Sequence, residues 1–315
     1  MTMAFIFPGQ GSQAAGMGKA LAGNFAAARA VFEEVDQALG QKLSTLIWEG
    51  PEADLTLTEN AQPALMAVSM AVVRVLETEH GITVANAAKF VAGHSLGEYS
   101  ALAAAGTFTL DDAARLLRTR GQAMQSATPA GTGAMAALLG LDFATAAAAA
   151  AEAAQGEVCQ AANDNSDGQV VVSGTKAAVE RCAGIAKAKG AKRAVMLNVA
   201  APFHCTLMQP AADVMAEALS KVAMKAPVVP VVANVGAAPL TDPAAIRDSL
   251  VAQVTGIVRW RECVAYMAAH GVTRFYEIGA GKVLTGLSKK NAPEAAAFAI
   301  NSAEDIAAAA AQIKG

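Results

Sequence analysis

The sequence predicts an α/β protein, in which helices cover a mainly parallel sheet and a smaller subdomain is inserted into the chain. Short apolar runs alternate with helical patterns through most of the 315 residues, and this alternation is typical of parallel sheets with helices on their faces. Between residues 130 and 199 the order of elements changes, which indicates the insertion. Hydrophobic residues make up 54% and charged residues 16% of the chain, a composition that excludes a disordered protein.

The first part of the large subdomain begins with an apolar strand at Met3–Phe7, which ends in the polar, turn-rich segment Pro8–Gln13. A second apolar run, Phe90–Gly93, leads into a glycine-rich turn. The remaining segments have helical periodicity and predict helices at Asn24–Leu39, Gln62–His80, Leu96–Ala105 and Leu110–Ala127.

The small subdomain, residues 130–199, is predicted from a different order of elements. The patterns indicate a strand, a helix, two strands, a helix and a strand. They lie at Ala134–Gly140, Thr145–Ala154, Val158–Ala161, Gln169–Ser173, Lys176–Lys189 and Arg193–Val199. Because β-α-β-β-α-β over about seventy residues is the ferredoxin-like pattern, we expect an inserted ferredoxin-like subdomain.

The α/β alternation resumes after residue 199, so residues 1–129 and 200–315 are expected to form one large subdomain. Apolar runs predict strands at Val228–Ala233, Arg274–Ile278 and Ala296–Ile300. Helical patterns lie at Leu207–Val222, Pro243–Gln253, Arg259–His270, Lys282–Lys290 and Ala303–Ile313.

Charge and hydropathy exclude several classes of protein. The net charge of −3 argues against a nucleic-acid binder that relies on phosphate contacts. No apolar run reaches the roughly 18 residues that a membrane span needs, and the N-terminus lacks the basic start of a signal peptide, so a cytoplasmic protein is expected. The four cysteines form no C-x-x-C pair, so we expect reduced, buried thiols and no metal site.

The most informative segment is Gly93–Gly97 (GHSLG), between a predicted strand and a predicted helix. This is the G-x-S-x-G nucleophile elbow in its strand–turn–helix context, and it favours an α/β-hydrolase-like sheet in the large subdomain. The glycines permit a tight turn. Ser95 then projects from the helix start, where the N–H of Leu96 can face a developing oxyanion. The alternative is a helix-capping serine between incidental glycines.

A serine nucleophile needs a base, and the chain has four histidines. His94 adjoins Ser95 on the turn and is interpreted as structural. His80 and His270 each precede a glycine at a helix end, a common place for a histidine. His204 lies in a loop between a strand and a helix, where catalytic side chains are frequent, so by elimination it is the best base. No carboxylate stands out as a third member, which leaves a backbone carbonyl as the alternative orienting group.

Six short motifs are spread over nearly the whole chain. They are Phe7–Gln13 (FPGQGSQ), Thr58–Leu65 (TENAQPAL), Gly93–Tyr99 (GHSLGEY), Arg120 within Arg118–Gln125, Pro202–Cys205 (PFHC) and Gln253 within Leu250–Val254. In this order and spacing they closely resemble the motifs of malonyl-CoA:acyl carrier protein transacylases of bacterial type II fatty acid synthesis. Each motif alone is weak to moderate, and their joint order makes the match specific.

The resemblance implies a role for each of the main site residues. Ser95 would carry the malonyl group as an ester in a ping-pong reaction, and His204 would act as its base. Backbone N–H groups of Gln10 and Leu96 would form the oxyanion hole. The backbone carbonyl at Gln253 would orient the histidine. The reaction would need no cofactor, because it exchanges one phosphopantetheine thioester for another.

The resemblance also implies how the substrate is selected. Arg120 would bind the free malonyl carboxylate, since a guanidinium pairs with a carboxylate through two parallel hydrogen bonds. From the residues alone, a lone arginine on a helix is more typical of a solvated surface. Phe203 resembles malonyl-selecting versions of its loop, with core packing as the alternative. Asn163 belongs to an asparagine-rich segment that resembles a loop facing the site.

The implied partners are malonyl-CoA and acyl carrier protein. Carrier proteins of such systems are acidic, so a basic docking patch is expected. The candidates are Lys189 and Lys192 on the small subdomain and Lys289 and Lys290 near the C-terminus, with ordinary solvated lysines as the alternative. No nucleic acid or membrane partner is expected, and a monomer is predicted.

Three other functions are compatible with the sequence. The same transferase could serve a polyketide system. An α/β-hydrolase esterase also uses G-x-S-x-G, but its histidine comes late in the chain, where His270 is the only one available. A non-catalytic scaffold that binds carrier proteins is the third, and the intact set of Ser95, His204 and Arg120 argues against it.

Overall fold

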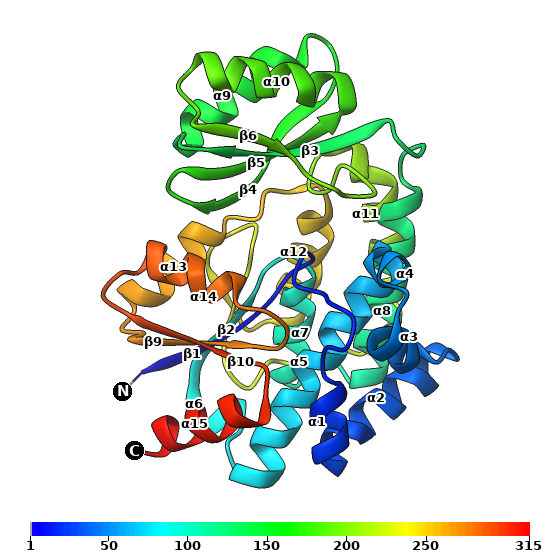
Figure 1. Cartoon of the computed structure of the whole chain (residues 1–315), viewed down its shortest axis with the longest axis vertical. Helices are drawn as coiled ribbons and strands as arrows, with labels where there is room; N and C mark the ends of the chain where they lie inside the picture. Colours follow the sequence, from blue (N-terminus) through cyan, green and yellow to red (C-terminus); the bar gives the residue numbers. More distant parts are fainter. Residues whose placement is uncertain (1) are drawn as a thin grey trace.

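The computed structural model describes residues 2–315, which form two units that each contain one sheet. Figure 1 shows a small sheet with two helices on its outer face, above a larger sheet surrounded by helices. The larger sheet is mainly parallel and the smaller one antiparallel. The predicted mixed α/β class is therefore confirmed.

The large sheet has six strands in the order β10-β9-β1-β2-β7-β8. All neighbouring pairs are parallel except β7 and β8. The strands are β1 (Met3–Phe7), β2 (Ala88–Gly93), β7 (Val231–Val232), β8 (Pro239–Leu240), β9 (Arg274–Ile278) and β10 (Ala296–Ile300). Because β1 and β2 run in parallel, the loop after Phe7 and the turn after Gly93 lie at the same edge of the sheet.

The helices of the large unit surround this sheet, some of them packed mainly against other helices (Figure 1). They are α1 (Lys19–Asn24), α2 (Ala26–Leu39), α3 (Leu43–Glu49), α4 (Glu52–Thr56), α5 (Thr58–His80), α6 (Val84–Ala87), α7 (Leu96–Ala104), α8 (Leu110–Ser126), α11 (Gln209–Ser220), α12 (Pro243–Thr255), α13 (Trp260–Ala269), α14 (Val283–Asn291) and α15 (Ala303–Lys314). In β1, Phe5 and Phe7 join the core cluster formed with α2, α5, α7 and α8, whereas Ala4 and Ile6 join the one formed with α13 and α14. A strand with both faces buried explains the continuous apolar run.

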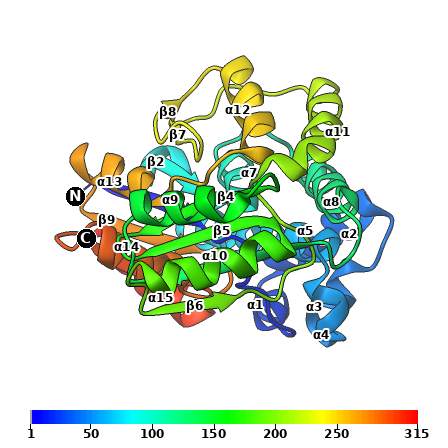
Figure 2. The same ribbon diagram turned by 90° about the horizontal axis from the view of Figure 1, so that it is seen from above.

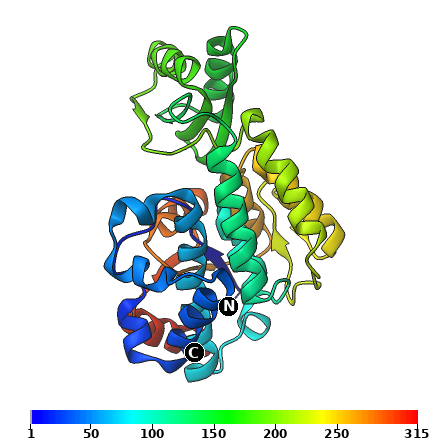
Figure 3. The ribbon, with the colours of Figure 1, turned by 90° about the vertical axis from the view of Figure 1, so that its right-hand side faces the viewer.

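The small unit has its own core and its own sheet, in the order β4-β5-β3-β6. Its elements are β3 (Gly133–Leu139), α9 (Phe143–Ala154), β4 (Cys159–Ser166), β5 (Gln169–Thr175), α10 (Lys176–Ala188) and β6 (Arg193–Met196). Seen from above, α9 and α10 lie over this sheet and cover it (Figure 2). Helix α8 rises from the large unit toward it (Figure 3), and Asn163 pairs with Val258 of the large unit.

Several elements differ from their predicted bounds in the first third of the chain. The predicted helix Asn24–Leu39 begins two residues later, at Ala26, because Phe25 has extended backbone angles (φ −126°, ψ 119°), and Asn24 is the last residue of the separate short helix α1. Helix α5 begins at Thr58, before Pro63, and so is longer than predicted. Helices α3, α4 and α6 were not predicted, since helices of four to seven residues are too short to show a period.

Three strands also differ from prediction. The predicted strand Val228–Ala233 is reduced to Val231–Val232, because Pro230 has no N–H to donate to a ladder. Strand β6 ends at Met196, three residues early. Strand β4 continues to Ser166 and includes Asn163, which was expected in a loop. Asn and Asp disfavour strands, but this segment pairs with β5 on one side and touches Val258 on the other.

Candidate active site

The predicted nucleophile elbow connects β2 to α7. Ser95 has φ 53° and ψ −111°, a strained conformation for a residue with a side chain. Glycine is required on both sides of it, because a Cβ at Gly93 would overlap the backbone of Gly97, and one at Gly97 would overlap the carbonyl of Phe7. These close backbone contacts hold the strained serine at the carboxyl edge of the sheet, facing the small unit.

The side chain of Ser95 contacts His204, as the elimination of other histidines predicted. Ser95 Oγ lies 2.8 Å from His204 Nε2. His204 Nδ1 lies 2.9 Å from the carbonyl oxygen of Gln253, at the end of α12. A carbonyl oxygen only accepts, so Nδ1 carries the hydrogen and Nε2 is free to accept one from the serine. His204 also has a positive φ of 59°, so nucleophile and base are both held in uncommon backbone conformations.

Burial, and then the nearby charge of Arg120, lowers the pKa of His204 to about 3. Both effects disfavour the charged imidazolium. His204 is therefore neutral, and able to accept a proton, over the whole physiological pH range.

Arg120 is 1% exposed and points into the site from α8. Nη1 donates to Gln62 Oε1 at 2.8 Å. Nη2 donates to Gln253 Oε1 at 2.8 Å and to Ser95 Oγ at 3.2 Å. The ring of Tyr99 lies 5.6 Å from the guanidinium carbon. The alternative of a solvated surface arginine is therefore wrong.

The two amides expected to form the oxyanion hole lie at the ends of the adjacent strands. Leu96 is the first residue of α7, and Gln10 lies in the loop after β1. Within residues 2–315, the N–H of neither residue donates to a protein acceptor, whereas the N–H of Ser95 is taken by Asn234 Oδ1 at 2.8 Å. Helix dipole and free amides therefore both favour negative charge beside Ser95.

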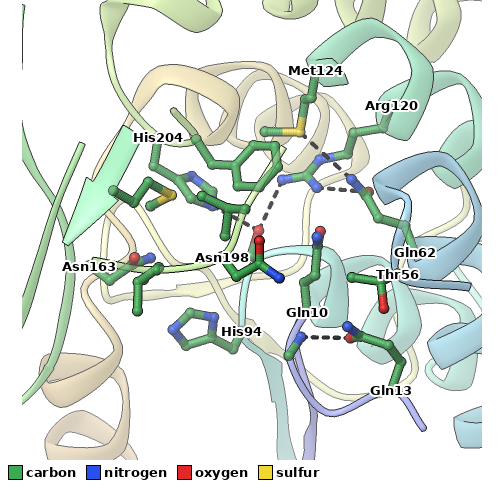
Figure 4. Close-up of a pocket in the computed structure, with 16 residues that line it drawn as sticks. Gln10, Gln13, Thr56, Gln62, His94, Arg120, Met124, Asn163, Asn198 and His204 are labelled. Carbon is green, nitrogen blue, oxygen red and sulfur yellow. Dashed lines mark hydrogen bonds between the residues drawn. The ribbon is translucent and has the colours of Figure 1, made fainter. Parts of the chain in front are cut away.

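Ser95, His204, Arg120 and Gln10 line a cavity of about 320 Å³ between the two units. Figure 4 shows Arg120 and Gln62 on one side, His204 and Asn163 on the other, and Asn198 between them. Phe203 and Met135 contribute apolar surface. The expected substrate-contacting positions Phe203 and Asn163 thus both lie at the cavity, and Phe203 also packs into the main core.

Sequence reasoning missed a buried polar network behind the nucleophile. Glu98 Oε2 accepts from the N–H of Asn234 and from Gln253 Nε2, both at 2.9 Å. Burial raises the pKa of Glu98 to about 7. Gln62 was noted only as part of a motif, without a role. Glu98 follows Ser95 by three residues, but nothing in the sequence links it to Asn234, 136 residues away.

The other histidines do not reach the nucleophile. His94 is half-buried, with Nε2 2.8 Å from Asn165 Oδ1, and its ring lies against Trp260. His270 caps α13 and stacks on Tyr266. Its carbonyl accepts from Lys89 Nζ, at the other end of β2 from the elbow. The arrangement that an esterase would need, with His270 beside Ser95, is absent.

The structure also describes the cysteines, possible metal-binding groups and possible membrane-spanning helices. All four cysteines are buried and unpaired, as expected. Among residues 2–315, no three His, Cys, Asp or Glu side chains are grouped so that they could hold a metal ion. None of the helices in this range is long and apolar enough to cross a membrane.

Comparison with known proteins gives consistent matches over the full length. A family model described as acyl transferase domain matches residues 4–309. The malonyl CoA-acyl carrier protein transacylase of Escherichia coli K12 is 49% identical over 306 residues, which cover 97% of this chain and 98% of that protein. The enzyme of the same name from Bacillus subtilis 168 is 48% identical over 289 residues, 91% of this chain and 90% of that protein.

Solved structures match as well. The acyl-carrier-protein-S-malonyltransferase of Bartonella henselae is 56% identical, with a TM-score of 0.98 and full coverage of both chains. A malonyl-transacylase in complex with its type II PKS acyl carrier protein is 44% identical, with a TM-score of 0.96, and covers 99% of this chain and 100% of that one.

Proposed function

Because this chain belongs to the acyl transferase family, and within it to the malonyl-CoA:acyl carrier protein transacylases, we propose that it moves malonyl groups from coenzyme A to acyl carrier protein in fatty acid synthesis. The observation that carries the proposal is one cavity in which Ser95 contacts both a neutral histidine, His204, and a buried guanidinium, Arg120. Ser95 and His204 can transfer an acyl group, and Arg120 can recognise a carboxylate.

In the first half-reaction, Ser95 Oγ attacks the malonyl thioester carbonyl while His204 Nε2 takes the hydroxyl proton. The Gln253 carbonyl holds the Nδ1 hydrogen and so stabilises the imidazolium that forms. The oxyanion accepts from the N–H groups of Gln10 and Leu96, where one lost donor typically costs about a hundred- to a thousand-fold in rate. Collapse of the tetrahedral intermediate expels the coenzyme A thiolate, which takes the proton from His204. The malonyl group is then an ester on Ser95.

The second half-reaction reverses these steps with another thiol. His204 takes the proton of the carrier's phosphopantetheine thiol, and the thiolate attacks the ester on Ser95. The serine leaves with the proton from His204. Because thioester bonds are exchanged for one another, we propose that no cofactor is needed. Water is the competing nucleophile, so the enclosed cavity also protects the ester.

Arg120 supplies the preference for malonyl. A guanidinium has five N–H donors, and the contacts to Gln62, Gln253 and Ser95 occupy three of them. The longest of these is the 3.2 Å contact to Ser95 Oγ. We propose that the malonyl carboxylate takes over this donor together with the unused one on Nη1. An acetyl group offers no such partner, and the guanidinium stays uncompensated.

We also propose that Phe203 and Asn163 contact the bound acyl chain. Phe203 would crowd a branched extender unit, and Asn163 would donate to or accept from the thioester end. Both line the cavity, on segments from different units.

Each of the two units has its own proposed fold. We propose that residues 2–129 and 200–315 form an α/β-hydrolase-like unit and that residues 130–199 form a ferredoxin-like unit; Met1 of the predicted range 1–129 lies outside the described residues. The antiparallel strand order β4-β5-β3-β6, with α9 and α10 on one face, supports the second description. Since one chain supplies every residue of the proposed mechanism, we propose a monomer, and the coenzyme A substrate favours a cytoplasmic enzyme.

The carrier protein is proposed to dock beside the end of α14. Lys289 and Lys290 are exposed in its last turn, and the next residue, Asn291, donates to the carbonyl of Asn165 in β4 at 2.9 Å. The pair therefore lies close to the strand that carries Asn163. Lys189, by contrast, is paired with Glu152 at 2.9 Å.

Charge reversal tests this surface. Lys289→Glu with Lys290→Glu should slow transfer to the carrier several-fold and leave malonyl loading from coenzyme A unchanged. Lys189→Glu is the matched control and should change neither half-reaction. Unchanged carrier kinetics in the double variant would remove the α14 surface from the proposal.

The function itself is tested by following the two half-reactions with the His204→Ala and His270→Ala variants. Labelled malonyl-CoA should load the wild type and His270→Ala equally, and His204→Ala should lose loading. An esterase would show the opposite dependence on the two histidines, with free malonate as its product. A protein that binds carrier but takes no label would be a scaffold.

A further inference from the structure

Asn234 follows the two-residue strand β7 and has no role in the steps described above. It is fully buried, and its side chain spans the nucleophile elbow. Nδ2 donates to the Gly93 carbonyl at 2.7 Å, and Oδ1 accepts from the Ser95 N–H at 2.8 Å. Gln253 Nε2 also approaches Oδ1, at 3.3 Å. Two donors face Oδ1 and one acceptor faces Nδ2, so the orientation of the carboxamide is fixed.

These two hydrogen bonds have the pattern of a parallel sheet. There, a residue donates its N–H to the carbonyl of one residue in the neighbouring strand and accepts, at its carbonyl, from the N–H two positions further on. Strands β2 and β7 pair at Val91 and Val231, and the same register places Asn234 beside His94. The backbone leaves the sheet after Val232, and the side-chain carboxamide continues the ladder in its place.

The surroundings hold Asn234 itself in position. Its N–H donates to Glu98 Oε2 at 2.9 Å, and its carbonyl accepts from the Arg259 N–H at 3.0 Å. Every polar group of Asn234 is thus bonded within the protein. Because the Ser95 N–H is occupied, the Leu96 N–H is the amide next to Ser95 that has no protein acceptor within residues 2–315.

We propose that Asn234 is a positioning residue for acyl transfer: its carboxamide acts as a substitute strand peptide that holds Ser95 in its strained, reactive conformation. The inference rests on the proposed transfer through Ser95. Asn234 touches the elbow backbone and lines no part of the cavity, so its loss should affect the rate of loading and leave malonyl-CoA binding unchanged.

Replacing Asn234 by aspartate gives a readout that a general packing role would not produce. A protonated carboxyl can donate to the Gly93 carbonyl and accept from the Ser95 N–H, as the carboxamide does. An ionised carboxylate only accepts, and it would face the Gly93 oxygen without a hydrogen between them. The variant should therefore be active while the new carboxyl is protonated and lose activity as it ionises.

The charged and titratable groups around the position set the direction of that change. Glu98 on α7 faces it directly. At the start of α13, the Arg259 N–H bonds to the Asn234 carbonyl, and Cys263 Sγ donates to the carbonyl of the preceding residue, Ala233. Arg120 on α8 is separated from Asn234 by Gln253, which bonds to both. Burial and the Glu98 carboxylate both raise the pKa of a carboxyl placed here, whereas the two arginines lower it. Because Asn234 is fully buried, the effect of burial dominates, and we expect ionisation above the ordinary aspartate range.

The experiment measures single-turnover malonyl loading of wild type, Asn234→Asp and Asn234→Ala from about pH 5 to 8.5, as ratios to wild type. Asn234→Ala should load roughly ten- to a hundred-fold more slowly at every pH, since it leaves two buried backbone groups without partners. Its KM for malonyl-CoA should stay within about two-fold of wild type. Asn234→Asp should approach wild type at low pH and fall at least ten-fold, to about the Asn234→Ala level, as pH rises.

Asn86→Asp is the matched control. Asn86 also donates to a glycine carbonyl, that of Gly81, and accepts from a backbone N–H, that of Thr83, but on the exposed helix α6 at the far end of β2. Its loading should follow wild type at every pH. Melting temperatures of all variants, measured across the same range, show which data come from folded protein.

Two results would overturn the inference: an Asn234→Asp to wild-type ratio that stays constant with pH in folded protein, or loading of Asn234→Ala at the wild-type rate. If Asn234→Asp unfolds at the upper end of the pH range, the loading rate of Asn234→Ala alone tests the inference. Failure of the wild type to load malonyl at any pH would instead refute the proposed function.

Discussion

Arg120 gives the sharpest prediction about substrate choice. Its guanidinium is buried and charged, and its hydrogen bonds to Gln62 and Gln253 involve neutral amides. Replacing it with methionine keeps an unbranched apolar stem against Tyr99 and removes the charge. The malonyl carboxylate would then enter the cavity without a partner.

The size of the effect follows from breaking a buried ion pair. Leaving one partner uncompensated costs roughly 3–5 kcal/mol. At about 1.36 kcal/mol per factor of ten, this lowers kcat/KM for malonyl-CoA by roughly 200- to 5,000-fold. Acetyl-CoA has no carboxylate to lose, so its kcat/KM should stay the same or rise.

The assay compares malonyl-CoA and acetyl-CoA as donors to the same carrier protein. Arg118→Met is the control, because Arg118 lies on the same helix but bonds to Asn60 and Gln41, away from the cavity. It should leave the ratio of the two donors unchanged. If Arg120→Met keeps the wild-type preference for malonyl-CoA while still folded, the role assigned to Arg120 is wrong.

Three further predictions concern the elbow and the buried acid and base. Gly97→Ala should abolish loading and lower the melting temperature, because the added Cβ overlaps the Phe7 carbonyl; Gly23→Ala, with open space around it, should leave loading intact. Burial lowers the pKa of His204 to about 3, so loading should show no loss from this group near the ordinary histidine pKa of about 6.5, and a titration of the free enzyme centred there that persists in Glu98→Gln would contradict a neutral base. Between pH 4.5 and about 7, folded protein holds a proton on Glu98 that the unfolded chain has released, so this carboxyl lowers stability as pH rises. Glu98→Gln should therefore gain stability relative to wild type through that window in urea unfolding, and parallel pH dependences would refute the raised pKa.

The elements that the sequence predicted well are those with local signals. The elbow carries its glycines, its serine and its strand–helix junction within a few residues, and the structure places Ser95 there. Strand β1 is apolar on both faces, as a central parallel strand should be. The short helices and the two-residue strand β8 have too few residues to show a period.

The parts of the site that the sequence left open depend on distant contacts. Arg120 looks like any helical arginine until the fold buries it against Gln253, 133 residues away. Asn234 meets Ser95 across 139 residues and has no motif of its own. Asn163 was expected in a loop, because its local composition disfavours the strand that pairing with β5 imposes. The positions of these residues are determined by long-range hydrogen bonds and not by the secondary-structure preferences of the local sequence.

The central claim is that Ser95 carries the malonyl group between two thiols. Incubating the protein with malonyl-CoA and no carrier, then mapping the product by peptide mass spectrometry, tests it directly. One malonyl ester should be found on the peptide that contains Ser95, it should disappear when carrier protein with a free phosphopantetheine thiol is added, and Ser95→Ala should carry none. Absence of the ester, its attachment to another residue, or its persistence in the presence of carrier would contradict the claim.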